Sequence, residues 1–191
     1  ANRTPGMGLP HRSTAAGGER LASQLFEAGV ADRVIGVHMP DAAFYTQLEA
    51  VMHLDTLMTK VSPDTYLRFP GFTEVTTVEI EPGEAGRALK VTVHDGSQMD
   101  AVLARAAGID SFRVISPGAS DEAEALRELA RDSCNVVALA PGRVIGYAHN
   151  QRANDALRKA GIEVVETPGV ELVRGRGGSH CMTCPVTRDA V

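Results

Sequence analysis

The residues with the clearest chemical potential lie near the end of the sequence, where a cysteine follows a segment rich in glycine and arginine. The segment reads Glu171-Leu-Val-Arg-Gly-Arg-Gly-Gly-Ser-His-Cys-Met-Thr-Cys-Pro185. Nearby cations lower the pKa of a thiol, and the thiolate is the nucleophilic form of cysteine. We therefore expect a flexible cationic loop that favours a reactive thiolate at Cys181. The alternative is a glycine-rich tail whose arginines are solvated.

Cys181 and Cys184 form a Cys-x-x-Cys pair, which admits a redox and a metal-binding interpretation. A thioredoxin-like pair would open a helix early in a βαβ unit, whereas this pair precedes Pro185. A structural zinc site needs four ligands, commonly from two such pairs, and Cys134 is the only other cysteine. The sequence therefore favours a nucleophile over a disulfide or zinc site.

A second motif, His53-Leu-Asp55, could supply a proton carrier and an anion. The alternating pattern of side chains over Met52–Val61 predicts a strand, which would place the His53 and Asp55 side chains on one face. An imidazole on that face could move protons while the carboxylate anchors a charged substrate. A buried structural His–Asp hydrogen bond is the alternative. A cysteine nucleophile with a histidine remote in sequence is a recognised catalytic pair, which favours catalysis.

Arg12 precedes the first predicted helix within the segment His11-Arg-Ser-Thr14. Its guanidinium could bind a substrate carboxylate through two parallel hydrogen bonds, or it could lie on the surface. The residues alone favour the surface.

Composition restricts the class of protein. The 191 residues are 43% hydrophobic and carry a net charge of −5, which is ordinary for a globular domain and argues against nucleic acid as a partner. No apolar run approaches the roughly 18 residues of a membrane-spanning helix, and the first residues lack the apolar core of a signal peptide. The three cysteines cannot all pair, which is consistent with free thiols. We therefore expect a cytoplasmic protein with no membrane partner.

The elements that must position these residues alternate between helices and strands. A loop is expected over residues 1 to 16, and a helix or irregular stretch over Asp41–Val51. The predicted helices are Gly17–Gly29, Ser97–Ala107, Asp121–Arg131 and Gln151–Ala160. Besides Met52–Val61, the predicted strands are Val34–Met39, Tyr66–Phe69, Val75–Ile80, Ala88–Val93, Phe112–Ile115, Asn135–Leu139, Val144–Tyr147 and Ile162–Val165.

Three of the predicted helices end in an Ala-Gly pair and are followed by an apolar strand. The glycines are Gly29, Gly108 and Gly161. Such a repeat indicates a ring or stack of modules. The alternative is an ordinary α/β protein, in which glycine commonly ends a helix before a strand.

Taken together, these motifs resemble the arginine deiminases of the guanidine-modifying enzyme superfamily. The resemblance is carried by Arg-Gly-Arg-Gly-Gly-Ser-His-Cys-Met-Thr-Cys-Pro, by Met-His-Leu-Asp-Thr-Leu-Met-Thr upstream of it, and by Asn-Val-Val-Ala-Leu-Ala-Pro-Gly-Arg-Val-Ile-Gly-Tyr. His-Arg-Ser-Thr is similar to a Glu-Arg-Thr segment of that family. The resemblance covers nearly the whole chain.

The resemblance implies an α/β fold of the pentein type, a five-module α/β propeller. It implies that Cys181 is the nucleophile and His53 the general acid and base. Asp55 would bind the guanidinium of L-arginine, Arg12 its α-carboxylate, and Arg176 would line the entrance. The products would be L-citrulline and ammonia, with no metal or organic cofactor, and the full-length protein would be a homo-oligomer.

The sequence also departs from the family. A Glu-Gly-Gly-Asp segment and a second guanidinium-binding aspartate, both expected ahead of Arg12, are not in these residues, and position 11 is His where the family often has Glu. We therefore expect residues 1–191 to be the C-terminal part of one catalytic domain, about its last half, and to be inactive alone. A dimethylarginine hydrolase, an amidinotransferase, a non-catalytic arginine-binding module and a zinc-binding regulatory module are the alternatives.

Overall fold

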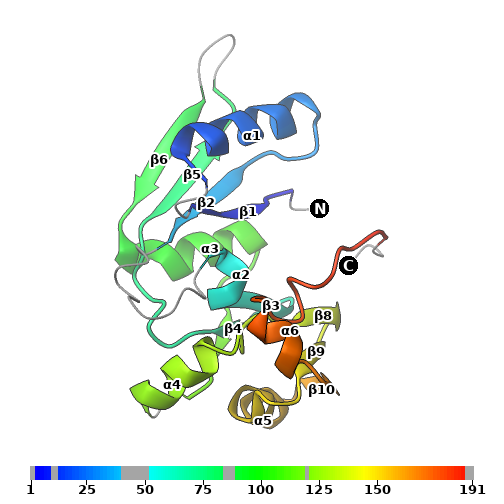
Figure 1. Cartoon of the computed structure of the whole chain (residues 1–191). Coiled ribbons are helices and arrows are strands. Elements are labelled where there is room, and N and C mark those ends of the chain that lie inside the picture. Colours follow the sequence, from blue (N-terminus) through cyan, green and yellow to red (C-terminus); the bar gives the residue numbers. More distant parts are fainter. Residues whose placement is uncertain (1–2, 10–12, 40–51, 84–88, 119–120, 188–191) are drawn as a thin grey trace. The chain divides into compact units, whose positions relative to one another are not determined.

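The computed structural model describes residues 3–9, 13–39, 52–83, 89–118 and 121–187. The chain divides into two compact units. The first comprises Ala1–Leu54 and Gly71–Arg113, and the second comprises Asp55–Pro70 and Val114–Val191. Both units combine sheet and helix (Figure 1), which confirms the mixed α/β class.

The first unit is built on a four-stranded sheet with the strand order β1-β2-β5-β6. β1 runs parallel to β2, and the other neighbours are antiparallel. The strands are β1 (Gly6–Leu9), β2 (Val34–His38), β5 (Thr77–Glu81) and β6 (Lys90–His94). The helices are α1 (Ala15–Glu27), the 3-10 helix η2 (Gly96–Gln98) and α3 (Met99–Ala107).

Helix α1 covers one face of this sheet, and its ends follow local rules. The Thr14 hydroxyl accepts a hydrogen bond from the Gly17 amide at the start. Past the end, Gly29 has a φ of 63°, which suits a residue without Cβ. Ala22 is fully buried against Val34 and Ile80 in the core of this unit.

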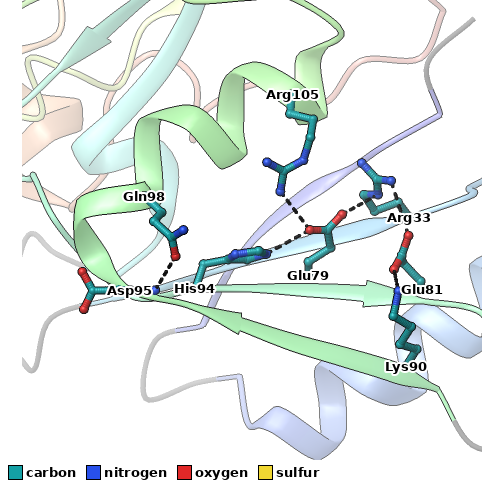
Figure 2. Close-up of polar contacts among 8 residues, drawn as sticks. All are labelled: Arg33, Glu79, Glu81, Lys90, His94, Asp95, Gln98 and Arg105. Carbon is teal, nitrogen blue, oxygen red and sulfur yellow. Dashed lines mark hydrogen bonds and ion pairs between the residues drawn. The ribbon is translucent and has the colours of Figure 1, made fainter.

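The opposite face of the sheet carries a buried carboxylate. Glu79 is only 7% exposed, and it meets Arg33, His94 and Arg105 (Figure 2). The distances are 2.7 Å from Arg33 Nε, 2.9 Å from His94 Nε2 and 3.0 Å from Arg105 Nη2. Burial raises the pKa of Glu79, but the bonds from His94 and Arg105 and the Arg33 charge outweigh it, so the pKa is lowered. The charge of this cluster is therefore internally compensated.

The turn into α3 is capped by Asp95 and Gln98. The Asp95 side chain accepts from the Ser97 amide, and Gln98 Oε1 accepts from the Asp95 amide. At the other end Gly108 is left-handed with a φ of 72°. Gly161, which ends α5 in the second unit, is left-handed too, with a φ of 85°. The three Ala-Gly pairs are thus real helix ends that precede strands.

The second unit contains two three-stranded sheets, ordered β3-β4-β7 and β10-β9-β8. The first residue of α2, Leu54, and the first residue of β7, Arg113, belong to the first unit, and the rest of both elements belongs to the second. The strands are β3 (Met58–Ser62), β4 (Thr65–Arg68), β7 (Arg113–Ile115), β8 (Val137–Ala140), β9 (Arg143–Tyr147) and β10 (Glu163–Thr167). The helices are α2 (Leu54–Leu57), α4 (Glu122–Leu129), α5 (Gln151–Lys159) and α6 (Val170–Arg174).

β8 and β9 form the expected antiparallel hairpin, with Gly142 at a φ of 77° in its turn. β10 then returns parallel to β9 after α5. The Gly142 amide also bonds to the Val61 carbonyl on β3, which links the hairpin to the other sheet of this unit.

Two sequence predictions are wrong, and one cannot be compared. Residues 6 to 9 form strand β1 rather than a loop.

The predicted strand Met52–Val61 is a strand only from Met58; before it lies the helix α2. His53 and Asp55 therefore do not share a strand face. A single helical turn is too short to show a 3.6-residue period, which explains the error. Asp41–Val51 lies outside the described residues.

In the described part of the chain, no helix has both the length and the apolar character that crossing a membrane requires.

Candidate active site

The loop that follows α6 is anchored to the second unit by buried hydrogen bonds. The Gly177 amide donates to Asp132 Oδ2 at 3.1 Å, and the Ser179 hydroxyl donates to the Ile145 carbonyl at 2.8 Å. Gly177 has a φ of 115°, a conformation that other residues rarely adopt. Residues 177–179 are buried. The sequence suggests a flexible carrier for the thiol. In the structure, hydrogen bonds at Gly177 and at Ser179 fix the buried part of this loop at its two ends.

Beyond this anchored stretch, three side chains converge on one oxygen of Asp55. Asn135 Nδ2 donates to Asp55 Oδ2 at 2.7 Å. His180 Nδ1 lies 2.9 Å from the same oxygen, and Cys181 Sγ lies 3.8 Å from it. An ionised carboxylate only accepts hydrogen bonds, so His180 carries its hydrogen on Nδ1 in this contact. The result is a carboxylate, an imidazole and a thiol assembled in one place.

Helix α2 and the α4–β8 connection supply the fixed parts of this cluster. Asp55 lies in the single turn of α2, and the Thr59 hydroxyl at the start of β3 donates to the Asp55 carbonyl at 3.1 Å. Asn135 lies two residues before β8 and is only 1% exposed. The carboxylate and the amide thus rest on elements packed into the unit.

The electrostatics of the cluster correct the prediction of a thiolate stabilised by arginines. Burial raises the pKa of Asp55, but the bonds from His180 and Asn135 more than offset it, and the pKa is lowered. Partial desolvation of the Cys181 thiol raises its pKa, and the negative charge of the Asp55 carboxylate raises it further. An ionised carboxylate therefore lies beside a protonated thiol.

The two arginines of the loop have other surroundings. Arg174 pairs with Glu171, Nη1 to Oε2 at 3.0 Å, on the exposed surface of α6. Arg176 follows with a φ of 73°. Its charge opposes the burial that raises the pKa of Asp132. Arg176 therefore influences the carboxylate that anchors the loop.

The other residues singled out in the sequence have different outcomes. His53 lies in the bend that precedes α2, on the first unit's side of the boundary, so its role stays a prediction. Arg12 lies outside the described residues. Ser179, which precedes His180 in the sequence, is buried, and its hydroxyl lies within hydrogen-bond distance of two main-chain carbonyls. Cys184 is exposed.

Sequence reasoning missed the roles of Asn135 and His180. The sequence places His180 next to Cys181 without indicating its contact with Asp55. Asn135 heads a predicted strand, where asparagine is disfavoured, and this was the available signal. In the described ranges no group of three or more His, Cys, Asp or Glu side chains could hold a metal ion.

Comparisons with known proteins agree with the motifs. The sequence matches the family model described as arginine deiminase over residues 1–188. Among solved structures, SxtG, an amidinotransferase from Microseira wollei in the saxitoxin biosynthetic pathway, is 16% identical. Its TM-score is 0.65, and the match covers 100% of this chain and 46% of that one.

Two further structures are similar. The N-terminal domain of ArgZ, a cyanobacterial arginine dihydrolase solved with its product, is 20% identical with a TM-score of 0.57, covering 95% of this chain and 50% of that one. A mutant of AgrE solved with L-arginine is 23% identical with a TM-score of 0.50, covering 90% and 20%. The chain thus spans half or less of each of these three structures, and at these identities the likeness establishes a shared fold.

Proposed function

The chain belongs to the arginine deiminase family, and from this premise we propose that it carries the nucleophile for hydrolysis of L-arginine to L-citrulline and ammonia. Cys181 is the nucleophile, His53 the general acid and base, and Asp55 the guanidinium ligand. Arg12 binds the α-carboxylate of the substrate, and Arg176 lines the entrance.

One observation carries the proposal, namely the carboxylate oxygen of Asp55 3.8 Å from Cys181 Sγ. An anion beside a thiol disfavours the thiolate, so this pair is a poor nucleophile by itself. The arrangement becomes productive when a cation binds to the carboxylate. A guanidinium ion neutralises Asp55 and adds positive charge next to the sulfur, and both effects lower the pKa of the thiol.

The same contact gives the substrate its orientation. Asn135, His180 and Cys181 all approach Oδ2 of Asp55. We assign Oδ1 to an N–H group of the substrate guanidinium. A guanidinium bound there would bring its central carbon next to Sγ, and orientation of this kind contributes much of the rate enhancement in enzymes.

The proposed reaction has two halves. As substrate binds, the thiol proton passes to water, and the thiolate attacks the guanidinium carbon. Protonated His53 gives its proton to the departing nitrogen, which leaves as ammonia, and a covalent S-alkylthiouronium remains on Cys181. His53 then takes a proton from water, and the resulting hydroxide attacks the same carbon. The C–S bond breaks with the electron pair on sulfur, the Cys181 thiolate takes up the hydroxyl proton of the product, and neutral citrulline is released.

Other members of the guanidine-modifying superfamily differ in the acceptor or in the substrate. An amidinotransferase would pass the amidino group from cysteine to an amine, and a dimethylarginine hydrolase would prefer a methylated guanidinium. A binding module would make no covalent bond.

The test combines product analysis with trapping of the intermediate. We expect the naturally expressed protein to release citrulline and ammonia in equal amounts from L-arginine, and a quenched reaction to show the thiouronium adduct on the Cys181 peptide by mass spectrometry. Cys181→Ala should abolish both signals. Turnover that persists in Cys181→Ala refutes the nucleophile assignment, and transfer to an added amine in place of citrulline release would indicate an amidinotransferase.

The larger architecture belongs to the same proposal. We propose that the small sheets with their helices are successive modules of a five-module pentein-type propeller, and that residues 1–191 are the C-terminal part of one catalytic domain. The helix-glycine-strand transitions at Gly29, Gly108 and Gly161 support this organisation. A cytoplasmic location and a homo-oligomeric full-length protein stay predictions.

A further inference from the structure

Asn135 uses both ends of its side chain to join Asp55 to the loop that carries Cys181. Its Nδ2 donates to Asp55 Oδ2 at 2.7 Å, and its Oδ1 accepts from the Cys181 amide at 3.0 Å. These partners lie 80 and 46 residues away in the sequence. One amide therefore fixes two groups that the chain itself does not hold together.

The backbone of Asn135 holds the same loop. Its carbonyl accepts from the His180 amide at 3.2 Å, and it shares the Ser179 hydroxyl, 3.1 Å away, with the Ile145 carbonyl. A Cβ on Gly178 would lie 2.5 Å from Asn135 Cβ and 2.7 Å from its carbonyl oxygen, so the loop backbone packs directly on this residue. Asn135 thus holds the loop that carries the thiol through its side chain, its carbonyl and its packing against Gly178.

The carboxamide at this position matches both of its partners. A carboxamide carries its donor and its acceptor on two separate atoms and has no charge, so it can donate to a carboxylate and accept from a backbone amide at the same time. Aspartate keeps the acceptor but loses the donor, and it would face Asp55 with a second negative charge. Alanine keeps neither function.

We propose that Asn135 is a positioning residue that sets the distance and orientation of the Asp55 carboxylate relative to the Cys181 sulfur. The inference rests on the proposed function, in which these two groups bind and attack the guanidinium. It goes further in assigning their spacing to an uncharged residue that contacts both, while the reacting atoms belong to other side chains.

The first test measures alkylation of Cys181 by iodoacetamide as a function of pH, followed on its own peptide by mass spectrometry. In Asn135→Asp the added charge should raise the pH midpoint by about one unit, a roughly tenfold slower alkylation below the midpoint. Asn154→Asp is the matched control, because Asn154 is equally buried and its Nδ2 donates to a carboxylate, Glu166, at 3.1 Å. The control should keep the wild-type midpoint. Equal midpoints in wild type and Asn135→Asp, or equal shifts in both variants, overturn the proposal.

A second test covers the case in which Asn135→Asp does not fold. Asp55→Asn should lower the alkylation midpoint in the wild-type background, because it removes the neighbouring charge. In an Asn135→Ala background the same change should lower it by less than half as much, since the carboxylate is no longer held against the sulfur. Additive effects of the two substitutions contradict a positioning role and indicate a purely structural residue.

Turnover is measured separately. Asn135→Ala should lose about 100-fold in kcat/KM for citrulline formation, with a lower kcat and a higher KM, because a small displacement of reacting groups is costly. Alkylation needs no substrate, so the spacing role is decided even if L-arginine is not turned over. Absence of turnover by the naturally expressed wild-type protein, of which residues 1–191 are the proposed C-terminal part, would refute the proposed function alone.

Discussion

Two carboxylates, one buried in the first unit and one half-buried in the second, differ in the groups that compensate them. Glu79 in the first unit meets two guanidinium groups and an imidazole (Figure 2). Asp55 in the second unit meets a neutral amide, an imidazole and a thiol. Both have a lowered pKa, so both are ionised at neutral pH.

The difference lies in the charge left over. At Glu79 cations are already in place, which stabilises the sheet and leaves little attraction for a further cation. At Asp55 the amide orients the carboxylate without cancelling its charge, and the side chain is 26% exposed. A carboxylate that is oriented but not neutralised can bind a cationic ligand, and this property distinguishes a binding site from a structural cluster.

The largest expected effect separates the two carboxylates by activity. Asp55→Asn should reduce kcat/KM for L-arginine by about 10² to 10³-fold, because a neutral amide neither attracts a guanidinium nor stabilises its reaction. Citrulline assays at several arginine concentrations measure this loss. The matched Glu79→Gln variant should stay within about threefold of wild type when corrected for folded protein. Similar losses of kcat/KM in Asp55→Asn and Glu79→Gln would contradict the distinction between a binding carboxylate and a structural one.

The second expected effect separates them by stability. Glu79→Gln should cost about 2 kcal/mol in the free energy of unfolding, because it leaves Arg33 and Arg105 without their shared anion. This value is below that of a fully buried pair, since the Arg105 side chain is 50% exposed. Urea denaturation measures it. Asp55→Asn should cost less than half as much, and a greater cost at Asp55 would contradict a primarily functional role.

A third effect concerns pH. The folded-state pKa of Glu79 lies below its ordinary value of 4.5, so its contribution to stability is present above that value and is lost as the pH falls through the folded-state pKa. The stability difference between wild type and Glu79→Gln should therefore be full near about pH 6 and shrink toward about pH 3. Denaturation curves at four or five pH values suffice. A difference that grows on acidification would show that the pKa is raised.

The smallest expected effect marks the rim of the Glu79 cluster. Lys90 pairs with Glu81 at 2.8 Å, but its side chain is 67% exposed. Exposed ion pairs contribute little, so Lys90→Met should leave both the free energy of unfolding and the activity close to those of the wild type. A loss as large as that of Glu79→Gln would extend the structural cluster to the edge strand.

Most of the elements could be predicted because their signals are local. Helix α1 follows from its apolar spacing and from Gly29, and the β8–β9 hairpin from the Pro-Gly turn between two apolar runs. Strand β1 and the turn α2 were missed because four residues carry too little periodicity to identify. Errors of this kind matter here, since α2 carries Asp55.

The sequence by itself determined the chemical inventory, namely a thiol in the Cys181 motif, a carboxylate in His-x-Asp and the family to which they belong. Only the tertiary structure decided their electrostatics. The loop brings Cys181 to Asp55, 126 residues away, so the thiol pKa is raised where neighbouring arginines in the sequence predicted a lowered one. It also revealed Asn135, because a buried amide acts through distant partners, and charge interactions depend on distance in space and not along the chain.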